Sequence, residues 1–278
     1  MPDSPGPGVL TGRVALVTGA ARNIGAASAR AIAAAGARVF VTDIDATGLE
    51  ATAAAIRAAH GPHAVATRVA DLADPAAAAD VVTAAVAEHG RLDVLVHAAV
   101  DRGRGRIEDL TPEQWHRAFA VNVGAATWLV REALPRLERD GGCVVLFSSV
   151  QAHGGIPGCS LYSSTKGAIE TLTKHLCVEL GSRGIRVNAI SPGAVTEDWH
   201  PRHPELPAYP LDRFGHPDEI ASLVVFLASP QASWTSGSIL TVDGGMTAMN
   251  PGHASARAKG WPRYRRVRSA VARRLRSR

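Results

Sequence analysis

A serine, a tyrosine and a lysine form the most reactive group of residues in this sequence. Tyr162 and Lys166 are four residues apart in a segment with helical apolar spacing, Ser160 to Leu180, so they share one face of the predicted helix. Ser149 follows the apolar run 143–147, which indicates a buried parallel strand. Open parallel sheets bind their ligands at the carboxyl ends of such strands. A phenol, an ammonium and a hydroxyl that converge there could transfer a proton to a carbonyl or from an alcohol.

The acidity of the tyrosine decides whether this group can act near neutral pH. A tyrosine with its ordinary pKa of about 10 is a poor base. A fixed ammonium nearby favours the phenolate, so we expect Lys166 to lower the pKa of Tyr162. A lowering of about 2 units requires about 2.7 kcal/mol of differential stabilisation. The same spacing also occurs on ordinary amphipathic helices, so the interpretation depends on the rest of the chain.

A glycine turn links the first predicted strand, Val14 to Thr18, to an alanine-rich helix. Gly19 permits a tight turn, and Gly25 permits close packing of the helix on the strand. Asn23 stands where a third glycine is expected, and asparagine tolerates a left-handed backbone. Backbone N–H groups at the start of a helix favour a pyrophosphate. The strand, turn and helix together predict a dinucleotide site.

An acidic residue, Asp43, ends the second predicted strand. Its carboxylate would accept hydrogen bonds from the adenosine ribose and repel a 2′-phosphate, although a helix N-cap is an alternative role. Arg22 argues the other way, because a guanidinium in the glycine turn could hold that phosphate. Ile44 adds no second positive charge. We therefore expect NAD(H) to be preferred, with NADP(H) possible.

Strand-like and helix-like segments alternate along the chain, which implies right-handed crossovers and one doubly wound, Rossmann-like α/β domain with a seven-stranded parallel sheet. A flexible leader (1–12) and an arginine-rich tail (250–278) would flank this domain (13–249). Further helices are predicted at Ala46–Ala59, Pro75–His89, a long pair spanning Pro112–Arg139, and Pro217–Ala228; further strands are predicted at Arg38–Thr42, Ala64–Val69, Asp93–His97, Ile185–Ile190 and Ser238–Val242.

Together these motifs resemble the short-chain dehydrogenase/reductase family of the Tyr-x-x-x-Lys type, from about Thr11 to Met246. The resemblance implies a catalytic set of Asn122, Ser149, Tyr162 and Lys166, in which the asparagine marks a helix bend and holds a water linked to the lysine. It also implies a homotetramer. The cofactor-binding positions that we expect are Gly19, Arg22, Asn23, Ile24, Gly25, Asp43, Asp71, Leu72, Ala98, Tyr162, Lys166, Pro192, Gly193, Val195 and Thr196.

Two stretches depart from the family pattern. The family's Asn-Asn-Ala-Gly is replaced by His97-Ala98-Ala99-Val100, which loses an amide side chain and a flexible glycine beside the cofactor. We expect His97 to be a packed strand-end residue and not a catalyst. The threonine expected five residues after Pro192 is Glu197, so contact with the nicotinamide amide would shift to Thr196 or be lost.

The substrate is predicted to be polar. The segment Glu197–Phe214 resembles the family's variable lid, and it is rich in hydrogen-bonding side chains and poor in aliphatic ones. Gln151, His153 and Trp199 are the candidate substrate residues. They favour a sugar, cyclitol or hydroxy acid over a steroid or acyl chain, unless these side chains simply face water.

The composition of the chain limits where the protein can act. No apolar run approaches the roughly 20 residues that span a bilayer, and no secretory signal pattern opens the chain. Three cysteines, Cys143, Cys159 and Cys177, have no metal-like spacing, so we expect reduced thiols, a cytoplasmic protein and no metal site.

The positive charge lies in the tail. Ten basic residues and no acid follow Asp243, and without those ten the net charge of +5 becomes −5. Apolar residues at helical spacing in the tail suggest a basic amphipathic helix for a membrane, nucleic acid, an anionic substrate or a neighbouring subunit. The alternative is a solvated, disordered tail.

The sequence therefore predicts an enzyme, a short-chain alcohol dehydrogenase or ketoreductase. It would transfer hydride between a nicotinamide and a carbonyl or secondary alcohol. The alternative is a non-catalytic dinucleotide-binding sensor or scaffold that interacts through its basic tail.

Overall fold

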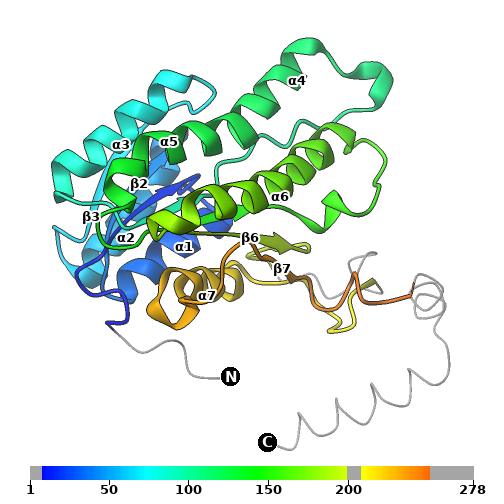
Figure 1. The fold of residues 1–278 in the computed structure, drawn as a ribbon. Coiled ribbons are helices and arrows are strands. Elements are labelled where there is room, and N and C mark those ends of the chain that lie inside the picture. The colour runs from blue at the N-terminus through cyan, green and yellow to red at the C-terminus, as the bar shows by residue number, and fades with distance from the viewer. Residues whose placement is uncertain (1–7, 199–207, 251–278) are drawn as a thin grey trace, which may run out of the picture.

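A seven-stranded parallel sheet forms the centre of the computed structural model, which describes residues 8–198 and 208–250 (Figure 1). The order β3-β2-β1-β4-β5-β6-β7 is that of a doubly wound fold, so the predicted fold class is confirmed. The strands are β1 (Val14–Thr18), β2 (Arg38–Asp43), β3 (Val65–Val69), β4 (Val94–His97), β5 (Cys143–Phe147), β6 (Arg186–Pro192) and β7 (Ile239–Val242).

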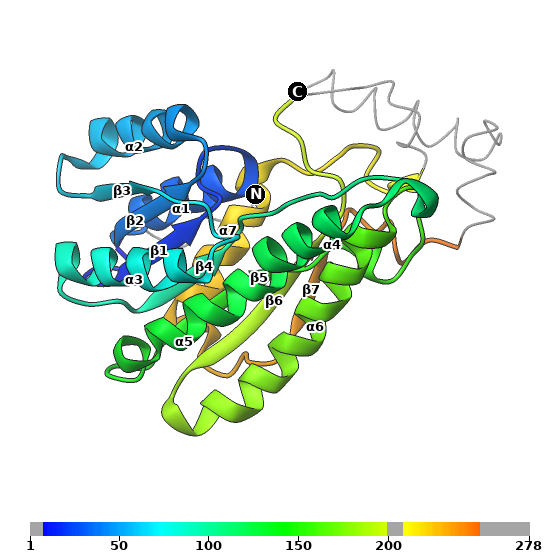
Figure 2. The ribbon, with the colours of Figure 1, turned by 90° about the horizontal axis from the view of Figure 1, so that it is seen from above.

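Helices cover both faces of this sheet (Figures 1 and 2). The strands are buried on both sides, and alternate residues of β1 enter different cores: Ala15 and Val17 pack into one, Val14 and Leu16 into the other. The first core contains α1 (Asn23–Ala34), α2 (Ala46–His60) and α7 (Pro217–Ala228); the second contains α3 (Pro75–His89), α5 (Ala125–Leu137) and α6 (Ser160–Leu180).

Most helices begin with a side-chain cap. Asp45 caps α2, Asp74 caps α3, and Thr111 caps α4 (Pro112–Phe119) in a capping box. His216 caps α7 in the same way. Helix α1 differs, because its N-cap residue makes no side-chain cap hydrogen bond and no acidic residue lies in its first turn. The N–H of Ile24 donates to the Asn23 Oδ1 at 2.8 Å, and the other N–H groups of the first turn are left for another acceptor.

The long helical region after Thr111 is interrupted. A π-helical turn, Ala120–Gly124, separates α4 from α5, and α5 ends at Leu137 where the sequence predicted helix to Arg139. Such wide turns often occur at functional sites. Short 3₁₀ turns complete the fold at Ile107–Asp109, Val150–Ala152, Gly181–Arg183 and Pro230–Ala232.

The segment just before β1 packs against the domain. Leu10, assigned to the leader, is 1% exposed, and its N–H donates to the carbonyl of Ala35 at 2.8 Å. An apolar side chain next to the α1 end explains the packing. Trp199 and the basic tail from residue 251 lie outside the described residues, so the predictions made for them stay untested.

The described part of the chain contains no helix that combines the length and the apolar character needed to cross a membrane. All three cysteines are free thiols, with Cys143 and Cys159 buried.

Candidate active site

Ser149, Tyr162 and Lys166 come together at the carboxyl end of β5. Ser149 follows the strand, while the other two lie on the first turns of α6. The Ser149 hydroxyl lies close enough to the Tyr162 phenol to act on the pKa of that phenol as a hydrogen-bonding group. The Lys166 Nζ lies 5.5 Å from the centroid of the Tyr162 ring and donates to the carbonyl of Phe147 at 2.7 Å. The structure thus brings the predicted hydroxyl, phenol and ammonium into one cluster.

The electrostatics of this cluster differ from the prediction. Burial raises the pKa of Tyr162, while the hydrogen bond to Ser149 and the charges of Arg102 and Arg104 act to lower it. Burial, aided by the charge of Arg102, lowers the pKa of Lys166 to about 7. The prediction that Lys166 lowers the pKa of Tyr162 is therefore wrong for this arrangement, because the ammonium is itself desolvated and directed at a backbone carbonyl.

Asn122 lies in the π-helical turn and connects the catalytic helix to the loop after β4. Its Nδ2 donates to the carbonyl of Asp101 at 2.8 Å and to the Thr165 hydroxyl at 2.9 Å. Its Oδ1 accepts the Asp101 N–H at 2.7 Å. Both amide hydrogens are used inside the protein, so a water could bind this residue only through an oxygen. The side chain positions the start of the loop against α6.

The glycine turn leaves no room for side chains. A Cβ on Gly19 would lie 2.5 Å from the Ala99 nitrogen, and one on Gly25 would lie 2.0 Å from the carbonyl oxygen of Gly19. Asn23 adopts a φ of +51°, the left-handed conformation that the sequence predicted. The bare backbone turn and the uncapped start of α1 suit a pyrophosphate group, so the residues present fit a dinucleotide.

Asp43 is tied to this turn. Its carboxylate accepts the N–H groups of Ala21 and Asp45, each at 3.0 Å. The alternative of a helix N-cap is wrong, because Asp45 caps α2. Arg22 is 76% exposed and lies 3.6 Å from the Asp45 carboxylate. Part of its charge is therefore compensated by a neighbouring acid.

His97 is a buried connector and has the packed position that the sequence predicted. Burial lowers its pKa to about 4, so the ring is neutral. Its Nε2 lies 3.1 Å from the carbonyl of Val121 and its Nδ1 lies 2.9 Å from the Thr18 hydroxyl, which accepts the N–H of Ala99. One tautomer satisfies the whole chain: Nε2–H donates to Val121, and Nδ1 accepts from Thr18. The histidine links the glycine turn to the π-helical turn.

The remaining candidate cofactor residues line the same edge of the sheet, with Ala98 beside Gly19 and Leu72 buried. Arg117, which sequence reasoning missed, lies 3.1 Å from the Asp71 carboxylate. The N–H of Gly193 donates to the carbonyl of Val242 at 3.0 Å. The Thr196 hydroxyl accepts the N–H of Asp198 at 3.1 Å. The neighbouring positions Ile24, Pro192 and Val195 are partly buried or buried.

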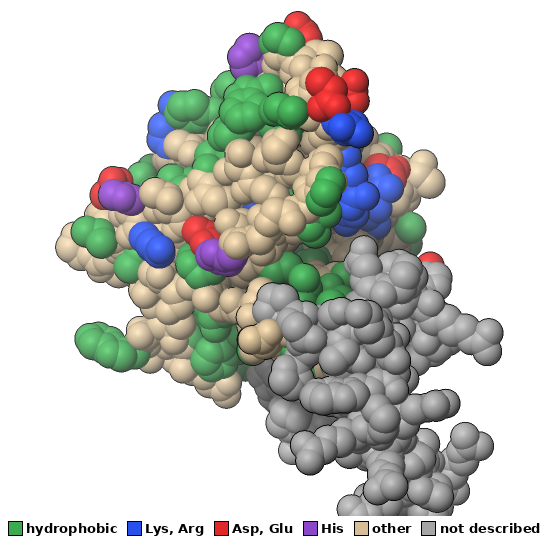
Figure 3. Space-filling view, turned by 90° about the vertical axis from the view of Figure 1, so that its right-hand side faces the viewer, with side chains coloured by type: hydrophobic (Ala, Val, Ile, Leu, Met, Phe, Trp, Pro, Cys, Tyr) green, Lys and Arg blue, Asp and Glu red, His purple; other side chains and the backbone are tan. Residues whose placement is uncertain are grey.

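Two of the candidate substrate residues border one cavity. This cavity of about 860 Å³ lies between the loop 151–158 and the segment 106–108. The Gln151 Oε1 is buried without a hydrogen-bond partner in the described part of the chain. The His153 Nε2 lies 3.0 Å from a carboxylate oxygen of the buried Glu170, so this ring is held by the protein itself. Figure 3 views this end of the molecule, where Lys and Arg side chains gather beside acidic ones.

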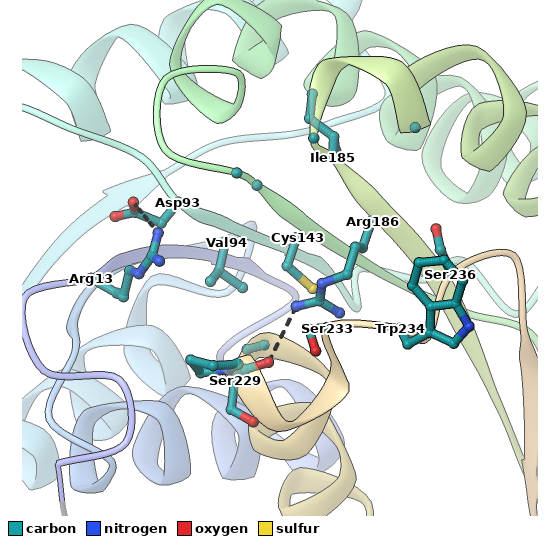
Figure 4. A pocket seen from close by; sticks show the side chains of 16 residues that line it. Arg13, Asp93, Val94, Cys143, Ile185, Arg186, Ser229, Ser233, Trp234 and Ser236 are labelled. Atoms are coloured by element: carbon teal, nitrogen blue, oxygen red, sulfur yellow. Dashed lines mark hydrogen bonds and ion pairs between the residues drawn. The ribbon is translucent and has the colours of Figure 1, made fainter.

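A second cavity, of about 530 Å³, lies at the opposite end of the strands (Figure 4). Arg13 and Asp93 form an ion pair at 3.0 Å on one side, and Cys143, Arg186 and Trp234 line it further along. Because it borders the amino ends of β4, β5 and β6, it lies at the other edge of the sheet from Tyr162.

Known proteins share this architecture. Residues 19–247 match the family model described as enoyl-(acyl carrier protein) reductase. The chain is 42% identical over 248 residues to the D-threitol dehydrogenase of Mycolicibacterium smegmatis, covering 86% of this chain and 94% of that enzyme. It is 38% identical over 251 residues to the 2-keto-3-deoxy-L-fuconate dehydrogenase of Xanthomonas campestris pv. campestris, covering 85% of this chain and 80% of that enzyme.

A solved structure agrees with these relatives. The short-chain dehydrogenase/reductase from Serratia marcescens superposes with a TM-score of 0.80 at 37% identity, covering 86% of this chain and 99% of that one. The matched region contains the glycine turn and the Ser149, Tyr162 and Lys166 cluster. The chain belongs to the short-chain dehydrogenase/reductase family and is an oxidoreductase of the alcohol dehydrogenase and ketoreductase class.

Proposed function

We propose that this enzyme transfers hydride between the nicotinamide of NAD(H) and a carbonyl or secondary alcohol of a polar substrate. Tyr162 is the general acid and base, and Ser149 holds the reacting oxygen. The observation that carries the proposal is the cluster of the Ser149 hydroxyl, the Tyr162 phenol and the Lys166 ammonium at the carboxyl end of β5. A non-catalytic sensor would have no role for this cluster.

The proton path follows from the same contacts. For reduction of a carbonyl, the carbonyl carbon receives the hydride, the phenol of Tyr162 donates its proton to the carbonyl oxygen, and the Ser149 hydroxyl donates a hydrogen bond to that oxygen. A tyrosine whose pKa is raised by burial is well protonated for this direction. For oxidation, the phenol must first lose its proton, and the charges of Arg102 and Arg104 favour that anion.

The cofactor would be held along the carboxyl edge of the sheet. When bound, the nicotinamide supplies or accepts the hydride. The Gly19–Gly25 turn and the start of α1 would bind the pyrophosphate, and Asp43 would accept hydrogen bonds from the adenosine ribose. The partial compensation of Arg22 by Asp45 supports NAD(H) over NADP(H). Lys166 would bind the nicotinamide ribose.

The polar substrate class is supported by the relatives named for a polyol and a sugar acid. The unpartnered Gln151 Oε1 also suits a substrate hydroxyl. We further propose a homotetramer in the cytoplasm, as the family resemblance and the free thiols suggest.

The test is the Tyr162→Phe variant, assayed by NADH absorbance against a panel of polyols, hydroxy acids and ketones. We expect cofactor affinity close to that of the wild type and turnover at least about 10²-fold lower, the usual scale for loss of an acid–base group. Near-wild-type turnover by the variant would end the assignment of Tyr162. A wild-type enzyme that oxidises or reduces no member of the panel, with NAD or NADP, would count against the polar substrate class.

A further inference from the structure

The loop after β4 carries arginines that alternate with glycines: Arg102, Gly103, Arg104, Gly105 and Arg106. Its glycines face the protein. A Cβ on Gly103 would lie 2.7 Å from the side chain of Leu161, the residue before Tyr162, and the N–H of Gly105 donates to the carbonyl of Gly158 at 3.0 Å. The loop is thereby fixed between the start of α6 and the segment that precedes it.

The start of this loop is held by the catalytic machinery itself. Asn122 makes two hydrogen bonds to the backbone of Asp101, and the Asp101 carboxylate accepts the N–H of Gly103 at 2.9 Å. The same carboxylate lies 3.4 Å from Arg117, so it is already engaged by another cation. Arg102 and Arg104 therefore project from a braced backbone beside Tyr162.

The charges of Arg102 and Arg104 are not compensated. Both side chains are exposed, and within residues 8–198 and 208–250 neither makes a hydrogen bond or an ion pair. Arg106, the next in the series, is paired with Glu108 at 2.6 Å. Arg102 and Arg104 flank Gly103, which packs against Leu161 next to Tyr162, and the charges of both act to lower the pKa of the Tyr162 phenol, so the loop brings positive charge to the reacting centre.

We propose that Arg102 and Arg104 bind an anionic group of the substrate, so that the enzyme's preferred substrates are hydroxy or keto compounds that carry a carboxylate or a phosphate. The inference rests on the proposed hydride transfer at Tyr162. Guanidinium groups suit both kinds of anion because their planar donors match the oxygen pairs. The loop ends at Arg106, where the cavity begins, and the buried Gln151 Oε1 in that cavity accepts a hydrogen bond from a hydroxyl of the same molecule.

Matched substrate pairs test this assignment. Threonate is compared with threitol, gluconate with sorbitol, and glycerol 3-phosphate with glycerol, each pair differing in the anionic group. We expect the wild type to have the higher kcat/KM for the acid of the productive pair. Arg102→Ala and Arg104→Ala should each lower the ratio of acid to neutral kcat/KM by about 10- to 100-fold, the range of one charge-assisted hydrogen bond. The carboxylate and phosphate pairs show which anion is used.

Arg131→Ala, on α5 and outside the cavity, is the matched control, because its guanidinium is already paired with Glu132 at 2.7 Å, and it should leave that ratio within about twofold. A wild type that prefers the neutral member of each pair overturns the inference while the proposed hydride transfer stands. An acid-to-neutral ratio that stays unchanged in both variants also overturns the inference. The same holds if the variants shift the pH profile of kcat equally for acid and neutral substrates, because the arginines would then act only on Tyr162.

Binding measurements decide the case in which no pair is turned over. The wild type with NADH is titrated with threonate, threitol and inorganic phosphate by calorimetry. Binding of threonate or phosphate that weakens about tenfold or more in Arg102→Ala supports the anion site even if the proposed reaction fails. Absence of binding by either anion, or binding that the variants do not change, overturns it.

Discussion

We expect the buried charge of Lys166 to lower the free energy of unfolding of this protein. The residue is 5% exposed, and burial lowers the pKa of its ammonium from 10.5 to about 7. Replacing it by methionine, which has a similar length and no charge, should therefore raise the free energy of unfolding while it impairs turnover. Such a gain in stability at the cost of activity is common where a site holds a buried charge.

The pH dependence gives this prediction its magnitude. Because the folded-state pKa lies below the unfolded value, the unfolded chain binds more protons between about pH 7 and 10.5, and the wild type gains stability as the pH rises through that window. At 1.36 kcal/mol per pKa unit, the penalty from Lys166 is about 5 kcal/mol near pH 6 and about 2 kcal/mol near pH 9. Loss of the hydrogen bond to Phe147 subtracts about 1 kcal/mol at either pH.

The assay is urea unfolding of the wild type and Lys166→Met at about pH 6 and pH 9, at one protein concentration. The stability advantage of the variant should shrink by about 3 kcal/mol between these two conditions, because packing differences of the methionine do not titrate. Lys174→Met, an exposed position on the same helix, should show no such change. An advantage of Lys166→Met that is constant with pH would refute the claim that burial controls this ammonium.

Two further predictions concern the cofactor edge. Gly25→Ala places a Cβ 2.0 Å from the Gly19 carbonyl oxygen, so it should cost about 1–3 kcal/mol of stability and weaken NADH binding. Gly167→Ala is the control: its Cβ meets open space, and the substitution should be neutral or slightly stabilising. Thermal unfolding measures the stability of both variants, and fluorescence titration measures their NADH binding. Asp43→Asn should lower the preference for NAD over NADP in kcat/KM by about tenfold, and an unchanged preference would remove Asp43 from the nucleotide assignment.

Local pattern was sufficient to predict most of the fold. The bounds of β1, β5, α3, α6 and α7 agree with the sequence predictions, because apolar periodicity and caps such as Asp74-Pro75 are local signals. The family resemblance predicted a helix bend at Asn122, but the local pattern did not reveal its π-helical form. Its residues, Ala120–Gly124, have helical periodicity, and the wider turn depends on contacts that Asn122 makes with Asp101 and Thr165.

The sequence predicted which residues form the site, but not the pKa values of their side chains. Tyr162 and Lys166 share a helix face by spacing alone, yet their pKa values depend on burial and on a loop about 60 residues earlier, which periodicity does not reveal. One signal in the sequence could have revealed this loop. Arginines alternate with glycines after the fourth strand, and such a segment can pack its glycine backbone closely against the protein while it carries positive side chains. The charges of Arg102 and Arg104 act on Tyr162 from this loop, so the pattern of α6 alone could not predict the pKa of the tyrosine.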